Sequence, residues 1–177
     1  METIEPRLTL AEFDALPDNG EWRELLDGRV LVNPSPLTDH QIAAGNLYTL
    51  LRAAREPDLP VFFAPFDYRP DDRTSLQPDV LVCRREDLGH RGLQRPPALA
   101  VEILSPSTRA QDLLRKRRVY EATGVDAYWI FEPEDAVLTV LELEDGRYVE
   151  RTFKSDEVFL AQRPFSVRIV PEELLEL

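Results

Sequence analysis

Residues 98–104, with the sequence ALAVEIL, form a continuous apolar run that contains a single carboxylate, Glu102. A run of this kind is typical of a central strand that other elements cover on both faces. A charged side chain inside a buried strand is costly unless it is paired with an opposite charge or bound to a metal ion, and glutamate is almost never fully buried alone. Glu102 is therefore the leading candidate for a functional residue.

A second carboxylate stands at the start of another short apolar segment. Asp79 follows Pro78 and opens residues 79–83, which we expect to form a strand. Two carboxylates on neighbouring strands can converge on one divalent cation, because Mg²⁺ takes oxygen ligands and keeps several of its waters. The competing interpretation of Glu102 is a structural ion pair with an arginine of the following helix. These two residues alone leave both interpretations open.

The segment that follows Glu102 carries the strong basic cluster of the chain. Residues 109–118, RAQDLLRKRR, hold five cationic side chains and one acid, Asp112. Asp112 and Lys116 are four residues apart and share one face of a helix. They form either a surface ion pair worth a few tenths of a kcal/mol at most, or an arrangement in which Asp112 orients Lys116 over the carboxylates. The cationic residues are Arg109, Arg115, Lys116, Arg117 and Arg118.

The order of the remaining elements predicts an α/β protein with a mixed sheet. Thr9 and Glu12 have the spacing of a capping box at the start of a short helix, and Thr38 or Asp39 is expected to cap the next one. Asp27-Gly28 is a turn signal between two strands. We expect helices at 9–16, 38–55 and 105–123, strands within 21–33 and at 61–68, 79–83, 98–104, 127–131, 137–143, 147–153 and 165–170, and a polar loop at 70–76.

Length and composition limit the classes of protein to consider. A chain of 177 residues with 43% hydrophobic residues predicts one domain, residues 1–177. Its longest apolar stretches are far shorter than a membrane helix requires, no secretory signal is predicted, and the single cysteine, Cys83, is compatible with a cytoplasmic location. The net charge of −12 argues against tight, sequence-independent DNA binding, which normally uses a basic face.

Several short pieces of sequence follow one another in an order that is specific as a set. They are Leu8–Phe13, Glu24–Gly28, His40, Pro78–Val80, Val101–Thr108, Asp112, Lys116, Tyr120 and Gly124–Ile130. With these pieces the chain resembles the Uma-two family, bacterial proteins described as restriction endonucleases and assigned to the PD-(D/E)XK nuclease superfamily. The resemblance runs through nearly the whole chain. It implies a restriction-endonuclease-like core, in which helices flank a mixed central β-sheet, followed here by a C-terminal antiparallel meander.

The resemblance also implies the residues of the site. By position, Asp79 and Glu102 are catalytic metal ligands, supplemented by Glu24 and by the backbone carbonyl of Ile103. The superfamily motif has a lysine two residues after the second acid, a position that Leu104 occupies here.

Lys116 is the natural substitute for the missing lysine, because a helix packed beside the strand can deliver an amine to the same place. Three further residues are expected to meet the substrate. Arg109 and Arg115 would guide the phosphate backbone, and His40 would contact the substrate or the site.

The leading hypothesis that follows is an endonuclease, dependent on Mg²⁺ or Mn²⁺, that hydrolyses phosphodiester bonds of DNA and acts as a homodimer. A second hypothesis is a catalytically weak or inactive module that acts through protein contacts. The acidic balance and the missing motif lysine favour this second reading, in which Glu102 pairs with Arg109 or Lys116 and binds no metal. A third is an enzyme for another phosphate ester or a small nucleic-acid fragment.

Overall fold

The computed structural model describes residues 7–105 and 111–177. Arg109 and most of the predicted helix start at 105–108 lie outside the described residues, and so does the side chain of Asp112. The statements that follow concern the described part of the chain.

A six-stranded mixed sheet forms the centre of the structure, as predicted. Strands β9 and β10 run parallel, and every other neighbouring pair in this sheet is antiparallel. The three C-terminal strands of the sheet, β10 to β12, form the expected antiparallel meander. In spatial order the strands are β12 (Arg147–Lys154), β11 (Val137–Glu144), β10 (Ala127–Glu132), β9 (Leu99–Ile103), β6 (Val80–Val82) and β3 (Val61–Phe63).

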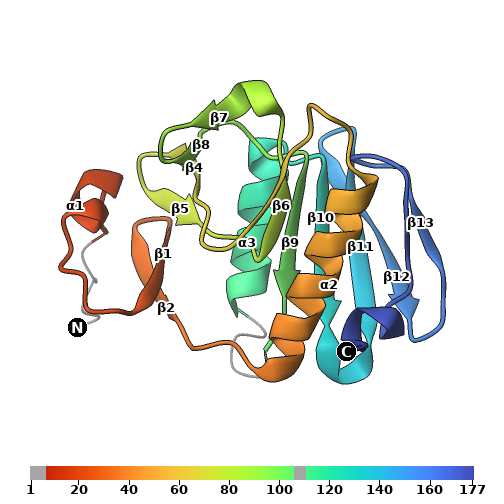
Figure 1. Cartoon of the computed structure of the whole chain (residues 1–177). Helices are drawn as coiled ribbons and strands as arrows, with labels where there is room; N and C mark the ends of the chain where they lie inside the picture. Colours follow the sequence, from red (N-terminus) through yellow and green to blue (C-terminus); the bar gives the residue numbers. More distant parts are fainter. Residues whose placement is uncertain (1–6, 106–110) are drawn as a thin grey trace.

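Helices α2 (Thr38–Ala54) and α3 (Gln111–Thr123) cover opposite faces of this sheet (Figure 1). Alternate residues of a strand point to opposite faces, and β9 follows this rule. Leu99, Val101 and Ile103 pack in one core cluster with Leu47 of α2, whereas Ala100 packs in the other with Tyr120 of α3. Glu102 has the parity of Ala100, so its side chain is directed to the α3 face.

A second six-stranded sheet packs on the α3 side. Leu26, Tyr68 and Leu93 of this sheet share a core cluster with Tyr120 of α3 and Tyr128 of β10. The hairpin of β1 and β2 closes through Asp27 and Gly28, whose φ angles of 51° and 77° are those of a two-residue hairpin turn. The spatial order is β2 (Arg29–Asn33), β1 (Trp22–Leu26), β5 (Thr74–Leu76), β4 (Tyr68–Asp71), β8 (Gly92–Leu93) and β7 (Leu88–Gly89).

The remaining elements are short. Helix α1 (Leu10–Asp14) begins with the predicted capping box of Thr9 and Glu12, and β13 (Phe159–Ala161) pairs with β14 (Val167–Ile169). Three 3₁₀ turns, η1 (Arg85–Asp87), η2 (Pro133–Asp135) and η3 (Glu172–Leu175), complete the described elements. Within the described residues, no helix combines the length and the apolar character that crossing a bilayer requires.

Three local predictions are wrong. Residues 70–76 are not a polar loop, because they include the end of β4 and all of β5, where Thr74 and Ser75 are buried. The predicted strand at 61–68 ends at Phe63, before Pro65, which cannot donate to a strand ladder. Neither Thr38 nor Asp39 caps α2, since the N-cap is Leu37 and makes no side-chain cap bond; both lie inside the first turn.

The core on the α2 side predicts a clear contrast between two leucines. Leu47 of α2 is fully buried, whereas Leu114 of α3 is 60% exposed. We expect Leu47→Ala to lower the free energy of unfolding by about 2–5 kcal/mol, because it leaves a cavity in a packed core. Leu114→Ala should change it by less than about 0.5 kcal/mol. Urea denaturation followed by circular dichroism measures both, and equal effects would contradict this packing.

Candidate active site

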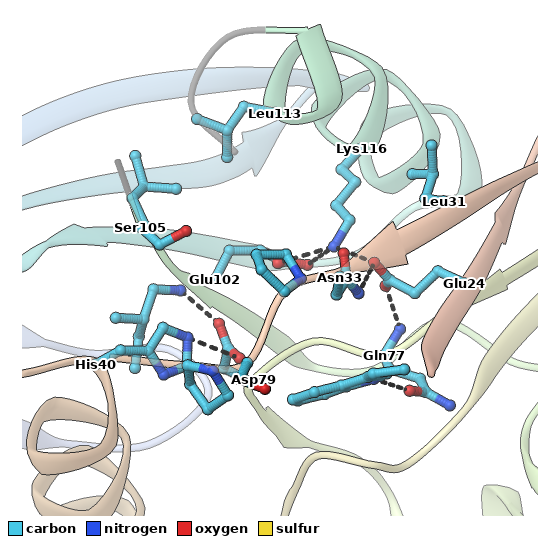
Figure 2. Close-up of a pocket in the computed structure, with 16 residues that line it drawn as sticks. Glu24, Leu31, Asn33, His40, Gln77, Asp79, Glu102, Ser105, Leu113 and Lys116 are labelled. Atoms are coloured by element: carbon cyan, nitrogen blue, oxygen red, sulfur yellow. Dashed lines mark hydrogen bonds and ion pairs between the residues drawn. The ribbon is translucent and has the colours of Figure 1, made fainter. Parts of the chain in front are cut away.

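Five ionisable side chains among the predicted site residues line one recessed cavity of about 70 Å³ (Figure 2). A cavity needs about 10–15 Å³ to hold one water molecule, so this one has room for a few waters or a hydrated ion. Separate elements bring the residues together: β1, α2, the residue before β6, β9 and α3. The five are Glu24, His40, Asp79, Glu102 and Lys116.

Lys116 is the central cation of the site. Its side chain descends from α3, and Nζ lies 2.9 Å from a carboxylate oxygen of both Glu24 and Glu102. Burial lowers the pKa of Lys116, but the charges of Glu102 and Glu24 outweigh burial and hold the pKa well above its ordinary value. Lys116 therefore keeps its charge inside the protein. The structure places the lysine over the carboxylates, as the resemblance implies.

Glu102 is nearly buried and accepts hydrogen bonds on both oxygens. Lys116 donates to Oε1 and Oε2 at 3.1 and 2.9 Å, and the hydroxyl of Tyr120 donates to Oε1 at 3.0 Å. Burial raises the pKa of Glu102 to about 7 against the opposing charge of Lys116, and the charges of Glu24 and Asp79 add to the rise. Its described ion-pair partner is Lys116, one of the two partners that the inactive-module hypothesis named; the other, Arg109, lies outside the described residues.

Asp79 is held by two groups from different elements. The backbone N–H of Ile103 donates to Oδ2 at 2.7 Å, and Nε2 of His40 lies 3.2 Å from Oδ1. Burial lowers the pKa of His40, but the hydrogen bond and charge of Asp79, together with the charge of Glu102, raise it above the ordinary value. The other ring nitrogen of His40, Nδ1, is buried without a hydrogen-bond partner among the described residues.

Glu24 is fully buried and has three donors. The backbone N–H of Gln77 donates to it at 2.6 Å, the side-chain amide of Asn33 at 2.9 Å, and Lys116 completes the set. Sequence reasoning missed Asn33 and Gln77. The hairpin register offered a signal for Asn33, because Asn33 pairs with Trp22 and so lies diagonally across from Glu24.

The donor set suits a hard cation. Each carboxylate has about four acceptor positions, and the described hydrogen bonds occupy three on Glu102 and two on Asp79. Among the described residues, no group of three or more His, Cys, Asp or Glu side chains is arranged to hold a metal ion. A pair is enough for Mg²⁺, which is usually bound by one or two carboxylates with water and substrate phosphate. Three carboxylates around one lysine also leave negative charge for a further cation.

The predicted residues outside this group have other positions. Arg115 of α3 does not line the cavity, and Arg117 pairs with Glu150 of β12 at 2.7 Å. Leu104, at the position of the missing motif lysine, contributes to the cavity wall. Ile103 also lines the cavity, and its role as a carbonyl ligand stays a prediction.

Fold and site together define a mixed α/β protein of the restriction-endonuclease-like class. A solved structure, titled as a "putative nuclease belonging to DUF820" from Anabaena variabilis, superposes with a TM-score of 0.78 at 18% sequence identity, covering 95% of this chain and 97% of that one. At this identity the likeness shows the fold. The Uma2 family model, described as "Putative restriction endonuclease", matches residues 10–170, and the chain belongs to that family. No curated protein matches the chain.

The buried ion pairs predict how the protein responds to loss of the lysine. Lys116→Met leaves two buried carboxylates without their cation, so we expect the free energy of unfolding to fall by about 3–5 kcal/mol at pH 8. Burial already raises the pKa of folded Glu102, and without the lysine it lies further above the unfolded value, so the cost from Glu102 is complete above the folded pKa. It should shrink as the pH falls through the folded pKa, because Glu102 then takes up a proton in the folded state and loses its buried charge.

Urea denaturation at pH 8 and pH 5 tests this expectation. Lys154→Met is the matched control, because Lys154 is the only other lysine of the chain and is exposed. Adding Glu24→Gln to Lys116→Met should restore part of the loss at pH 8. A cost for Lys116→Met that matches the control, or that grows on acidification, would contradict the arrangement.

Proposed function

We propose that this chain is a metal-dependent DNA endonuclease that hydrolyses phosphodiester bonds at the cavity between β9 and α3. The observation that carries the proposal is the convergence of Asp79, Glu102 and the buried Lys116 on one cavity, in a member of this family. Mg²⁺ or Mn²⁺ is the expected ion. We further propose one domain over residues 1–177, a cytoplasmic location, and a homodimer, whose symmetry would suit cleavage of two strands.

The chain's own residues have distinct proposed roles at the site. Asp79 and Glu102 would hold the ion. The backbone N–H of Ile103 and the imidazole of His40 fix the orientation of Asp79. When bound, such an ion lowers the pKa of water and stabilises charge on a phosphoryl group. Glu24 anchors Lys116.

Other groups would complete the site. Lys116 would present its ammonium to a phosphate oxygen that enters beside Glu102 and replaces one of the lysine's three carboxylate acceptors. Glu24 and the carbonyl of Ile103 are proposed as supplementary ligands, and His40 as a substrate contact. Arg109 and Arg115 of the basic segment would guide the phosphate backbone.

A second candidate function is a catalytically weak or inactive module that acts through protein contacts. Lys116 already neutralises part of the charge of Glu24 and Glu102, and the motif position after Glu102 holds Leu104. The two candidates differ in whether the cavity takes up a divalent ion. Isothermal titration of the wild-type protein with Mg²⁺ or Mn²⁺ separates them, since no heat at millimolar metal would favour the inactive module.

The metal-dependent proposal predicts the effect of two isosteric substitutions. Asp79→Asn and Glu102→Gln should each reduce Mg²⁺-dependent DNA cleavage by roughly a thousandfold, because removing a ligand forfeits several kcal/mol of transition-state stabilisation. Cleavage of labelled DNA is compared on a gel, and circular dichroism shows that each variant is folded. Asp126→Asn is the control, since this half-exposed carboxylate pairs with Arg84 outside the cavity. Cleavage at wild-type rate by both site variants would reject the proposal.

A further inference from the structure

An open groove of about 480 Å³ lies directly beside the cavity. Phe13, Leu16 and Pro65 line it together with residues of the segment 17–23, of which Asp18 and Glu21 are exposed. The cavity and the groove share two side chains, Trp22 and Gln77. The groove therefore adjoins the candidate active site, and two aromatic side chains, Phe13 and Trp22, are part of its lining.

The two spaces differ in what they can hold. Sites for organic ligands usually enclose about 300–1,000 Å³, so the groove has the size for a nucleoside, whereas the cavity of about 70 Å³ accepts only a phosphate-sized group. The side chains of Asp79, Glu102 and Lys116 are 12%, 11% and 9% exposed. A phosphate must enter a recess to reach them, which is difficult for the backbone of a continuous stacked duplex.

Trp22 is held in a fixed position at the junction. Its indole N–H donates to the side-chain oxygen of Gln77, and the Gln77 amide nitrogen donates to Asp67 at 2.7 Å. The backbone N–H of the same glutamine donates to Glu24 at 2.6 Å, as Figure 2 shows. Trp22 and Glu24 are two residues apart on β1, so their side chains share one face of the strand. One glutamine thus connects the indole ring to the carboxylate that anchors Lys116.

We propose that this groove binds the unpaired base next to the scissile phosphate, and that the substrate is single-stranded or locally unpaired DNA. The proposal rests on the proposed nuclease function and specifies its substrate class. The base stacks on Trp22 and Phe13 while its phosphate enters the cavity beside Lys116. Stacking on aromatic side chains is sequence-tolerant, because every base has a π-face.

The distribution of charge agrees with this orientation. Asp18 and Glu21 lie on the rim of the groove, where Arg23 is already engaged by Glu21 and by the carbonyl of Pro17. An acidic rim repels phosphate but tolerates a neutral base, so the base occupies the groove and the phosphate goes to the lysine. A chain with a net charge of −12 also has few cations for a long phosphate tract. Its affinity should therefore depend only weakly on salt.

The test measures binding without cleavage. Fluorescence anisotropy of a labelled single-stranded 12-mer, in EDTA, is compared with the same sequence as a blunt duplex. We expect the wild-type protein to bind the single strand at least tenfold more tightly. Trp22→Ala and Phe13→Ala should each raise the Kd for the single strand on the order of 5- to 100-fold, and Trp22→Phe should raise it less.

Controls make the result specific to the groove. Phe63→Ala removes an exposed aromatic ring that does not line the groove, and it should bind as the wild type does. Phe13 does not line the cavity, so its variant tests the groove even if Trp22→Ala disturbs Gln77. The single strand should also quench the fluorescence of Trp22, while the other tryptophan, Trp129, is fully buried and should stay unquenched in Trp22→Phe.

The outcomes separate this inference from the proposed function. Equal or tighter binding of the duplex, no binding of either DNA, or unchanged binding by both groove variants would overturn the groove proposal. If single-strand binding depends on Trp22 and Phe13 but Mg²⁺ produces no cleavage, the groove proposal is supported and the proposed nuclease activity is rejected. If duplex cleavage depends on Asp79 and Glu102 but not on the groove residues, the nuclease activity is supported and the groove proposal is rejected.

Discussion

The buried ammonium of Lys116 is the interaction on which the arrangement of the site depends. It joins three elements, because Glu102 lies on β9, the lysine itself on the next helix, α3, and Glu24 on β1, far away in the sequence. Two buried carboxylates this close would repel each other, and a cation between them turns that repulsion into a link between the second sheet and the central sheet. Tyr120, one helical turn after Lys116, donates to the same glutamate and helps hold α3 in register with β9.

The same balance of charge explains why an acidic protein can be expected to act on phosphate. Glu24, Asp79 and Glu102 surround the cavity, and Lys116, together with protonated His40 beside Asp79, offsets their negative charge only in part. The raised pKa of Glu102, about 7, reflects burial together with this excess of negative charge. A divalent ion would make the local potential more positive, so that the recess attracts phosphate more strongly when the ion is bound. The net charge of the chain therefore says little about the potential at the point where chemistry would occur.

Sequence reasoning succeeded where one strand carries the signal and failed where contacts cross between elements. Glu102 stands out because a carboxylate interrupts an apolar run, and the alternation of β9 decides which face it meets. The sequence predicts a loop at β5 because two of its three buried positions are Thr74 and Ser75, which a hydrophobic pattern does not detect. Gln77 holds Glu24 through a backbone N–H, a contact that has no side-chain signature. The residues alone left Lys116 undecided between surface and site, and only the family resemblance placed it.

The position of Leu104 shows how the lysine can leave the strand without leaving the site. In the superfamily pattern a lysine stands two residues after the second acid. By strand alternation its side chain would point to the same side as Glu102, which is the side that faces α3. Here Leu104 contributes an apolar wall to the cavity. The ammonium group belongs to Lys116 on α3, the helix that covers this face of the sheet. A lysine at both positions would place two ammonium groups beside Glu102 and remove the negative charge that a metal ion needs. On the proposal that Lys116 takes the role of the motif lysine, the ammonium reaches Glu102 from α3 while Leu104 supplies an apolar wall.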